Sequence, residues 1–178
     1  SSFRAGSSCD SGHAEDGPST GGFTLEVGER VVHATCGKHQ ATTLGASDGE
    51  LYESSRAVAS LSAHRGFVGE LGFAQTARSE LKCDSAAVVA IASNQASFKR
   101  SLYLARRARF VQEHCGSAGT LRIVKVDGEE NVADILTKVL LRKVFLRHRH
   151  NLMNLRGKPS VSAVTRALRA APYRFRFK

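Results

Sequence analysis

Apolar and polar residues alternate in short runs through the first forty residues of the chain. Residues 23–27 and 30–35 alternate with a period of two, and a Gly-Glu pair separates them, which predicts an antiparallel hairpin. A further strand is expected to end at residues 9–10, before a segment rich in Gly, Ser and Pro that is typical of a turn. These three strands predict an antiparallel meander.

Helical periodicity takes over after the hairpin. Ser47 and Glu50 have the spacing of a capping box, so we expect a helix to begin at Ser47. The expected elements downstream are a second helical piece at 65–71, a strand at 81–83, a helix at 85–92, a helix at 101–114, a strand at 121–126 and a helix at 131–141 that continues to 155 after a break. The helix at 101–114 is expected to bury one apolar stripe, formed by Leu104, Ala108, Val111 and Cys115. This order predicts an α/β fold with a five-stranded mixed sheet, three antiparallel strands followed by two parallel ones, flanked by helices.

The length of 178 residues suffices for one domain with a hydrophobic core. We assign residues 1–155 to this domain and residues 156–178 to a basic C-terminal extension. The sequence does not start with Met, and we expect a processed product or a fragment. No apolar run approaches the roughly 20 residues of a membrane helix, so no membrane partner is expected.

Charge is distributed unevenly along the chain, whose net charge is +10. Residues 139–178 hold 11 of the 26 Lys and Arg residues and none of the 16 acidic ones, which leaves residues 1–138 with a net charge of −1. Aromatic residues alternate with the basic ones at 173–177. This pattern indicates a nucleic-acid partner; the alternative is a solvated tail that serves solubility.

Cysteine spacing argues against a zinc site. The four cysteines are widely separated, and no C-x-x-C pair occurs. Cys9 and Cys83 each precede an Asp in a strand-like context, so we interpret both as small buried residues.

Four acidic residues fall at related places in the expected fold. Asp10 and Asp84 lie at strand ends, and Glu50 and Asp134 lie in the first turns of expected helices. Carboxylates that meet at one sheet edge repel one another and are stabilised by cations, and oxygen ligands favour Mg²⁺ or Mn²⁺. The alternative is that each acid is an exposed charge or a helix N-terminal anion.

Five segments, in order, resemble motifs of the ribonuclease H domain of copia-type retrotransposon polyproteins, over roughly residues 5–155. The segments are C-D-S-G-H-A at 9–14, P-S-T-G-G-F at 18–23, K-H-Q at 38–40 followed by L-G-A-S-D-G-E-L at 44–51, L-K-C-D-S at 81–85 and A-D-I-L-T-K at 133–138. The last is the most specific. The resemblance implies a ribonuclease H-like fold.

The resemblance also implies a chemistry. Asp10, Glu50, Asp84 and Asp134 would be catalytic and would bind two Mg²⁺ (or Mn²⁺) ions, with Asp10 bridging both. The implied reaction is endonucleolytic cleavage of the RNA strand of an RNA–DNA hybrid, the strands being told apart by the 2′-hydroxyl. A retroelement product of this kind is expected in the nucleus or cytoplasm.

Several residues depart from the family pattern. His13 replaces a common Trp, Leu102 and Tyr103 replace a basic-histidine pair, and Gly49 replaces Ala at a cost of about 1 kcal/mol in helix propensity. The alternative interpretation is therefore a domesticated, non-catalytic RNA-binding subunit of a large ribonucleoprotein, such as a mitochondrial ribosome, with protein neighbours and a mitochondrial location. The residues expected to bind nucleic acid under either interpretation are Lys99, Arg100, Arg106, Arg107, Arg147, Arg149, Arg156, Lys158, Arg166, Arg169, Arg174, Arg176 and Lys178.

Overall fold

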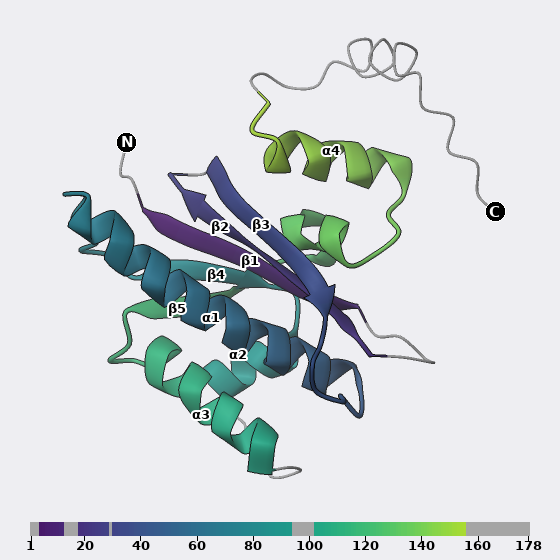
Figure 1. Cartoon of the computed structure of the whole chain (residues 1–178), viewed down its shortest axis with the longest axis horizontal. Helices are drawn as coiled ribbons and strands as arrows, with labels where there is room; N and C mark the ends of the chain where they lie inside the picture. The colour runs from purple at the N-terminus through teal and green to yellow at the C-terminus, as the bar shows by residue number, and fades with distance from the viewer. Residues whose placement is uncertain (1–3, 13–17, 29, 94–101, 156–178) are drawn as a thin grey trace.

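The computed structural model describes residues 4–12, 18–28, 30–93 and 102–155. Within these ranges it contains strands, α-helices and two short 3-10 turns (Figure 1). The strands are β1 Ala5–Gly12, β2 Thr20–Val27, β3 Arg30–Lys38, β4 Ser79–Cys83 and β5 Leu121–Lys125. The helices are α1 Ala46–Glu70, α2 Ala86–Ala92, α3 Leu102–Cys115 and α4 Arg142–Leu152, and the 3-10 turns are η1 Gly128–Glu130 and η2 Val132–Leu136.

The five strands form one mixed sheet in the order β3-β2-β1-β4-β5. The pairs β1–β2 and β2–β3 are antiparallel, whereas β4 is parallel to both β1 and β5. This arrangement confirms the predicted α/β class and the predicted change from antiparallel to parallel strands. The expected hairpin at residues 23–35 is the β2–β3 pair, extended at both ends.

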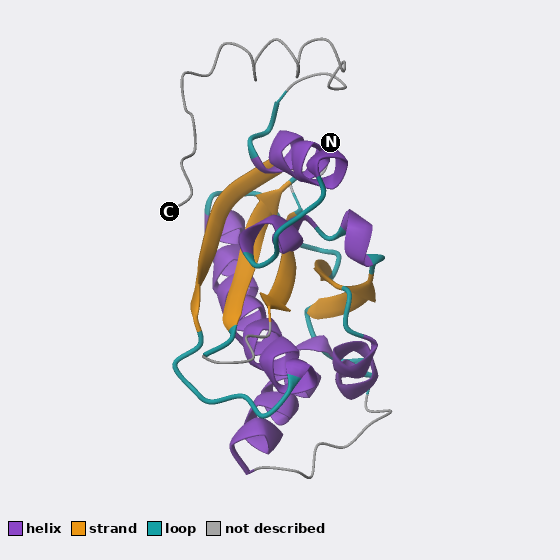
Figure 2. Cartoon of the chain, turned by 90° about the vertical axis from the view of Figure 1, so that its right-hand side faces the viewer, coloured by secondary structure: helices purple, strands orange, loops and turns teal. Residues whose placement is uncertain are grey.

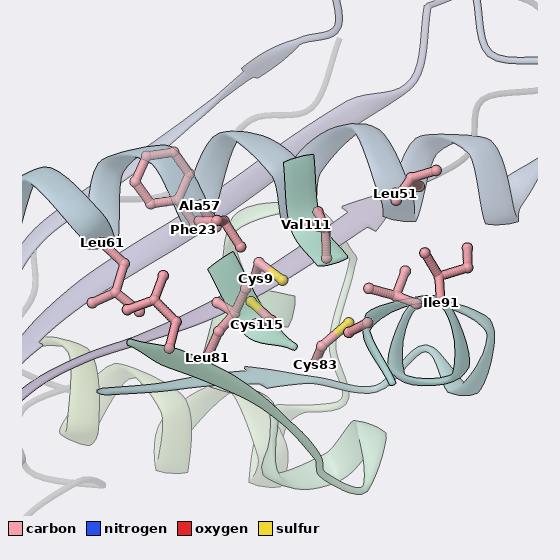
Figure 3. Packing of buried hydrophobic residues seen from close by; sticks show 14 of the residues in the cluster. Cys9, Phe23, Leu51, Ala57, Leu61, Leu81, Cys83, Ile91, Val111 and Cys115 are labelled. Atoms are coloured by element: carbon pink, nitrogen blue, oxygen red, sulfur yellow. The ribbon is translucent and has the colours of Figure 1, made fainter. Parts of the chain in front are cut away.

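The hydrophobic core lies between the sheet and the helices α1, α2 and α3. Figure 1 shows α1 running along the sheet with α3 beside it, and Figure 3 shows core residues from both layers pointing toward one another. Cys9 and Cys83 are fully buried there, as predicted. The expected apolar stripe of α3 is confirmed, because its members are all buried: Leu104, Ala108, Val111 and Cys115.

Helix α4 lies apart from this core, next to β3 and η2 (Figures 1 and 2). Segments far apart in sequence, α4 and β3, therefore meet on the side of the sheet that faces away from α1. No helix in the described ranges combines the length and apolar character needed to cross a lipid bilayer.

The predicted N-cap of the first helix, Ser47, is wrong by two residues. The helix begins at Ala46, and its N-cap is Gly45, whose extended backbone makes no side-chain cap. Instead, the carboxylate of Asp48 reaches back to accept a hydrogen bond from the Leu44 backbone N–H at 3.2 Å. The separate helical piece expected at 65–71 is also wrong, because α1 continues without a break to Glu70.

The predicted helix at 131–141 is wrong as well. Asp134 N donates to Asn131 O at 3.1 Å and Thr137 N donates to Asp134 O at 3.2 Å, which gives the tight turn η2 in place of an α-helix. The chain resumes helical structure only at Arg142. Contacts with the sheet, described below, override the local helical pattern.

Candidate metal and nucleic-acid site

Asp10 is fully buried near the end of β1, on the sheet face opposite α1. The neighbouring Cys9 has its sulfur 3.4 Å from Ser54 Oγ on α1. Because successive side chains of a strand point to opposite faces, Asp10 points to the face that η2 covers. There the hydroxyl of Thr137 donates a hydrogen bond to Asp10 Oδ2.

Glu50 and Asp84 approach this edge from two other elements. Asp84 directly follows Cys83, the last residue of β4, and Glu50 lies near the start of α1. One potential ligand atom from each of Glu50, Cys83 and Asp84 lies within 4.8 Å of the others. The Cys83 sulfur also accepts a hydrogen bond from the Ser85 backbone N–H at 3.4 Å, which fixes the turn after β4.

Asp134 completes the group from η2. Oxygen atoms of Asp10, Asp84 and Asp134 lie within 4.8 Å of one another, so Asp84 belongs to both this trio and the one with Glu50. The structure therefore brings together all four acids that the sequence singled out, although Asp134 reaches the site from a 3-10 turn rather than from an α-helix.

Asn131 is a positioning residue that the sequence reasoning missed. Its side chain is fully buried, and Nδ2 donates to Cys9 O at 2.9 Å. Its Oδ1 accepts a hydrogen bond from Ala133 N at 3.3 Å and so caps η2. One amide thus ties the Asp134 turn to the strand of Asp10. The signal available in the sequence was an Asn three residues before Asp134, the spacing of a helix N-cap.

Two glycines allow η2 to lie close against the sheet. A Cβ added at Gly12 would be 2.7 Å from Thr137 O, and one added at Gly22 would be 2.8 Å from Leu136 Cβ. Both contacts are shorter than any ordinary packing distance, so a side chain at either place would displace the turn. The absence of these side chains sets the separation between Asp10 and the η2 residues.

Lys138 is the second functional residue missed from the sequence. Its ammonium lies 2.9 Å from Asp10 Oδ1, 3.2 Å from Asp134 Oδ2 and 3.5 Å from Asp84 Oδ2. It was visible as the last residue of A-D-I-L-T-K, four residues after Asp134, a spacing at which side chains meet on a helical turn.

Burial and mutual repulsion shift the ionisation of the cluster. Desolvation raises the pKa of Glu50 to about 9, helped by the nearby Cys83, Asp10 and Asp84. Desolvation, followed by the charge of Asp10, raises the pKa of Asp134 to about 6, although Lys138 opposes this. Burial disfavours the Lys138 ammonium, but hydrogen bonding and charge from Asp10, then the charges of Asp134 and Asp84, raise its pKa overall. The cluster is thus short of positive charge.

The donor set fits a hard divalent cation. Within the described residues, Glu50 Oε2, Asp84 Oδ1 and Asp134 Oδ1 are buried and have no hydrogen-bond partner. Buried carboxylate oxygens of this kind are costly unless a cation or donor satisfies them. Mg²⁺ and Mn²⁺ prefer such oxygens. Cys83 adds one sulfur at the margin of the group.

The basic residues predicted to bind nucleic acid occupy different environments. Arg106 is exposed on α3, whereas Arg107 donates to Ser55 Oγ at 2.5 Å and lies 4.0 Å from the centre of the Tyr52 ring. Arg147 is exposed on α4 and pairs with Glu129 at 3.8 Å, and Arg149 is half-buried. The remaining predicted residues lie outside the described part of the chain: Lys99, Arg100, Arg156, Lys158, Arg166, Arg169, Arg174, Arg176 and Lys178.

Solved ribonuclease H structures share this architecture. The N-terminal ribonuclease H domain of a Mycobacterium tuberculosis protein is 16% identical with a TM-score of 0.52, covering 84% of this chain and 98% of that one. Ribonuclease H1 of Halobacterium salinarum is 19% identical with a TM-score of 0.54, covering 75% and 93%. LC11-RNase H1 from a compost metagenome, solved in complex with an RNA/DNA hybrid, is 19% identical with a TM-score of 0.56, covering 75% and 93%. The chain has a ribonuclease H-like fold.

One relative by sequence is a retrotransposon polyprotein. The chain is 24% identical over 155 residues to the retrovirus-related Pol polyprotein from transposon RE2 of Arabidopsis thaliana. The match covers 87% of this chain and 11% of the length of that polyprotein. It confirms the expected resemblance to a copia-type retrotransposon polyprotein. No protein-family model matches the chain.

Proposed function

We propose that the chain is a ribonuclease H-type nuclease that cleaves the RNA strand of an RNA–DNA hybrid with the help of divalent metal ions. The observation that carries the proposal is the convergence of four carboxylates from separate elements on one sheet edge, with Asp84 common to both trios. The fold and the retrotransposon relative support it, and LC11-RNase H1 of the same fold was solved with an RNA/DNA hybrid.

The proposed roles follow from the position of each carboxylate. Asp10 and Asp84, at the ends of neighbouring parallel strands, would hold the ions together with Glu50 from α1 and Asp134 from η2. Two divalent ions held there would activate the attacking water and stabilise the leaving oxygen. The rigid sheet and the buried Asn131 amide keep the carboxylates in place between turnovers.

Helix α4 supplies a surface suited to the nucleic-acid backbone. It contains four Arg and Lys residues and no acidic residue, and it packs against η2, which carries Asp134. Arg142, Lys143 and Arg147 are exposed on it. Phosphate contacts of this kind position a duplex without reading its sequence. We therefore place the hybrid across the acidic cluster with one backbone near α4.

A cleavage assay on the full chain tests the proposal. Mg²⁺ or Mn²⁺ should permit cleavage of end-labelled RNA in an RNA–DNA hybrid, and EDTA should abolish it. Asp84→Asn should lower the rate at least roughly 100-fold, because it removes charge shared by both trios. Glu113→Gln, the same loss of one charge at an exposed position on α3, is the matched control. Absence of cleavage, or equal rates for wild type and Asp84→Asn, would contradict the proposal.

A second candidate function is the non-catalytic RNA-binding subunit of a ribonucleoprotein. The observation that favours it is Lys138, whose ammonium already contacts three of the carboxylates, together with the cationic surface of α4. Under this proposal structured RNA binds equally well in EDTA and in Mg²⁺, no cleavage occurs, and binding weakens steeply with salt. Deletion of residues 156–178 should then release the protein from its particle. Unchanged association after that deletion would count against it.

A further inference from the structure

The ammonium of Lys138 lies among the same three carboxylates that form the Asp10, Asp84 and Asp134 trio. Its three nitrogen–oxygen distances are 2.9, 3.5 and 3.2 Å. The side chains of Asp10 and Asp134 are buried and that of Asp84 is 19% exposed, whereas the Lys138 side chain is 36% exposed and has a route to water. A cation of the protein itself thus contacts each of the three carboxylates that would hold a metal ion.

A divalent ion held by this trio would lie close to the ammonium of Lys138. Mg²⁺ binds carboxylate oxygens at about 2.0–2.1 Å. An ion on the unpartnered oxygens Asp84 Oδ1 and Asp134 Oδ1 would therefore lie only a few ångströms from the ammonium, which contacts the other oxygen of each carboxylate. Two cations a few ångströms apart repel, and partial burial makes the repulsion stronger than in water. Asp10 is the sharpest case, because Lys138 holds its Oδ1 and the Thr137 hydroxyl holds its Oδ2.

The backbone cannot relieve this competition. Lys138 N donates to Asp134 O at 2.9 Å, and Thr137 O lies so close to Gly12 that a Cβ there would be 2.7 Å away. The turn is therefore fixed against the sheet. Rotation of the Lys138 side chain toward solvent would separate the ammonium from the carboxylates.

We propose that Lys138 is the internal counterion of the carboxylate cluster and competes with the divalent ion for Asp10, Asp84 and Asp134, so that it sets the metal affinity of the site. The inference rests on the proposed function, because it concerns the metal site of that function. Without metal, the ammonium offsets the repulsion among the carboxylates and keeps the sheet edge folded. With metal, it moves aside, at a cost that weakens binding.

Metal affinity, measured on the full chain, tests this competition directly. Mn²⁺ is titrated and followed by electron paramagnetic resonance for wild type, Lys138→Met and Lys138→Arg. Loss of the charge should tighten Mn²⁺ binding roughly tenfold or more in Lys138→Met, while Lys138→Arg should stay near wild type. Lys143→Met, which removes the same charge from an exposed position on α4, is the matched control and should change little.

Thermal unfolding gives an independent readout. In EDTA, Lys138→Met should unfold at a lower temperature than wild type, and saturating Mn²⁺ should narrow or reverse the difference. Lys138→Gln, whose amide can still donate to the carboxylates, replaces Lys138→Met in both measurements if the latter does not fold. Equal or weaker Mn²⁺ binding in the neutral variant, or the same gain in Lys143→Met, would overturn the inference.

The outcomes also separate this inference from the nuclease proposal. If the neutral variant binds Mn²⁺ more tightly but neither wild type nor any variant cleaves the hybrid, only the nuclease proposal is contradicted. If wild type cleaves the hybrid but binds Mn²⁺ with the same affinity as the neutral variant, only the proposed competition by Lys138 is contradicted. If neither wild type nor any variant binds Mn²⁺, both the nuclease proposal and the proposed competition are contradicted.

Discussion

The side-chain amide of Asn154 pairs with both backbone groups of Val31 and fastens the end of the α4 segment to the edge strand β3. Val31 N donates to Asn154 Oδ1 at 3.0 Å, and Asn154 Nδ2 donates to Val31 O at 2.7 Å. Asn154 has a left-handed backbone with φ 52°, which Asn adopts more readily than most residues. The amide thus acts as a short strand partner at the sheet edge.

Substitutions at Asn154 should loosen α4 from β3. Asn154→Gly keeps the left-handed backbone and loses both hydrogen bonds, which should cost about 1–3 kcal/mol. Asn154→Ala also meets the left-handed strain, about 1 kcal/mol more. Urea unfolding measures these costs, and hydrogen exchange of the Val31 amide should accelerate in both variants. Unchanged exchange at Val31, relative to an exposed control such as Asn151→Ala, would contradict the role of this pair.

Glu50 should make the metal-free protein less stable as pH rises. Its pKa is raised from 4.5 in the unfolded chain to about 9 in the fold, chiefly by burial. Between these values the folded protein keeps a proton that the unfolded chain has lost. The free energy of unfolding should therefore fall by at most about 1.4 kcal/mol per pH unit as pH rises between these values. The stabilisation that comes from the proton on Glu50 is complete below pH 4.5 and lost above pH 9.

Glu50→Gln should remove this slope, because the amide cannot ionise. Urea unfolding in EDTA at pH 5.5, 7 and 8.5 compares the two proteins. The free energy of unfolding of the variant should increase relative to that of wild type as pH rises. Glu113→Gln serves as the exposed control and should keep the wild-type slope. The same pH dependence in Glu50→Gln and wild type would show that another group causes it.

Gly12→Ala should destabilise the protein and disturb the site. The new Cβ would meet the backbone oxygen of Thr137 at 2.7 Å, and overpacking of this kind costs typically about 1–3 kcal/mol. The displaced turn carries Thr137 and Lys138, so Mn²⁺ affinity should change as well. Gly37→Ala on β3, where nothing lies within 4 Å of the new Cβ, is the matched control. Equal unfolding free energies for the two variants would refute the close approach.

Arg106 and Arg107 should behave differently although they are adjacent. Arg107→Ala loses the bond to Ser55 and the stacking on Tyr52, which should cost about 1–3 kcal/mol of stability. Arg106→Ala, at an exposed position, should change stability by less than about 0.5 kcal/mol but weaken hybrid binding at low salt. Urea unfolding and fluorescence anisotropy measure the two effects. A stability loss in Arg106→Ala equal to that in Arg107→Ala would contradict this assignment.

The local pattern of the sequence was sufficient to predict much of the sheet and the positions of the four acids. Alternation at residues 23–27 and 30–35 records which face of each strand is buried, and it predicted β2 and β3. The stripe that includes Leu104 and Val111 predicted the buried face of α3 in the same way. Strand ends placed Asp10 and Asp84 at one edge, because parallel neighbours end on the same side of a sheet.

The sequence by itself determined the fold class, the order of the strands and the carboxylates of the candidate site. Only the tertiary structure decided that Val132–Leu136 form a 3-10 turn, that Lys138 lies among the carboxylates and that Arg107 contacts α1. Each of these depends on partners far away in sequence: Asn131 bonds to Cys9, 122 residues away, and Lys138 bonds to Asp10, 128 residues away. Periodicity in the sequence indicates which residues of a segment are buried. Hydrogen bonds between distant segments then determine which of several local conformations the segment adopts.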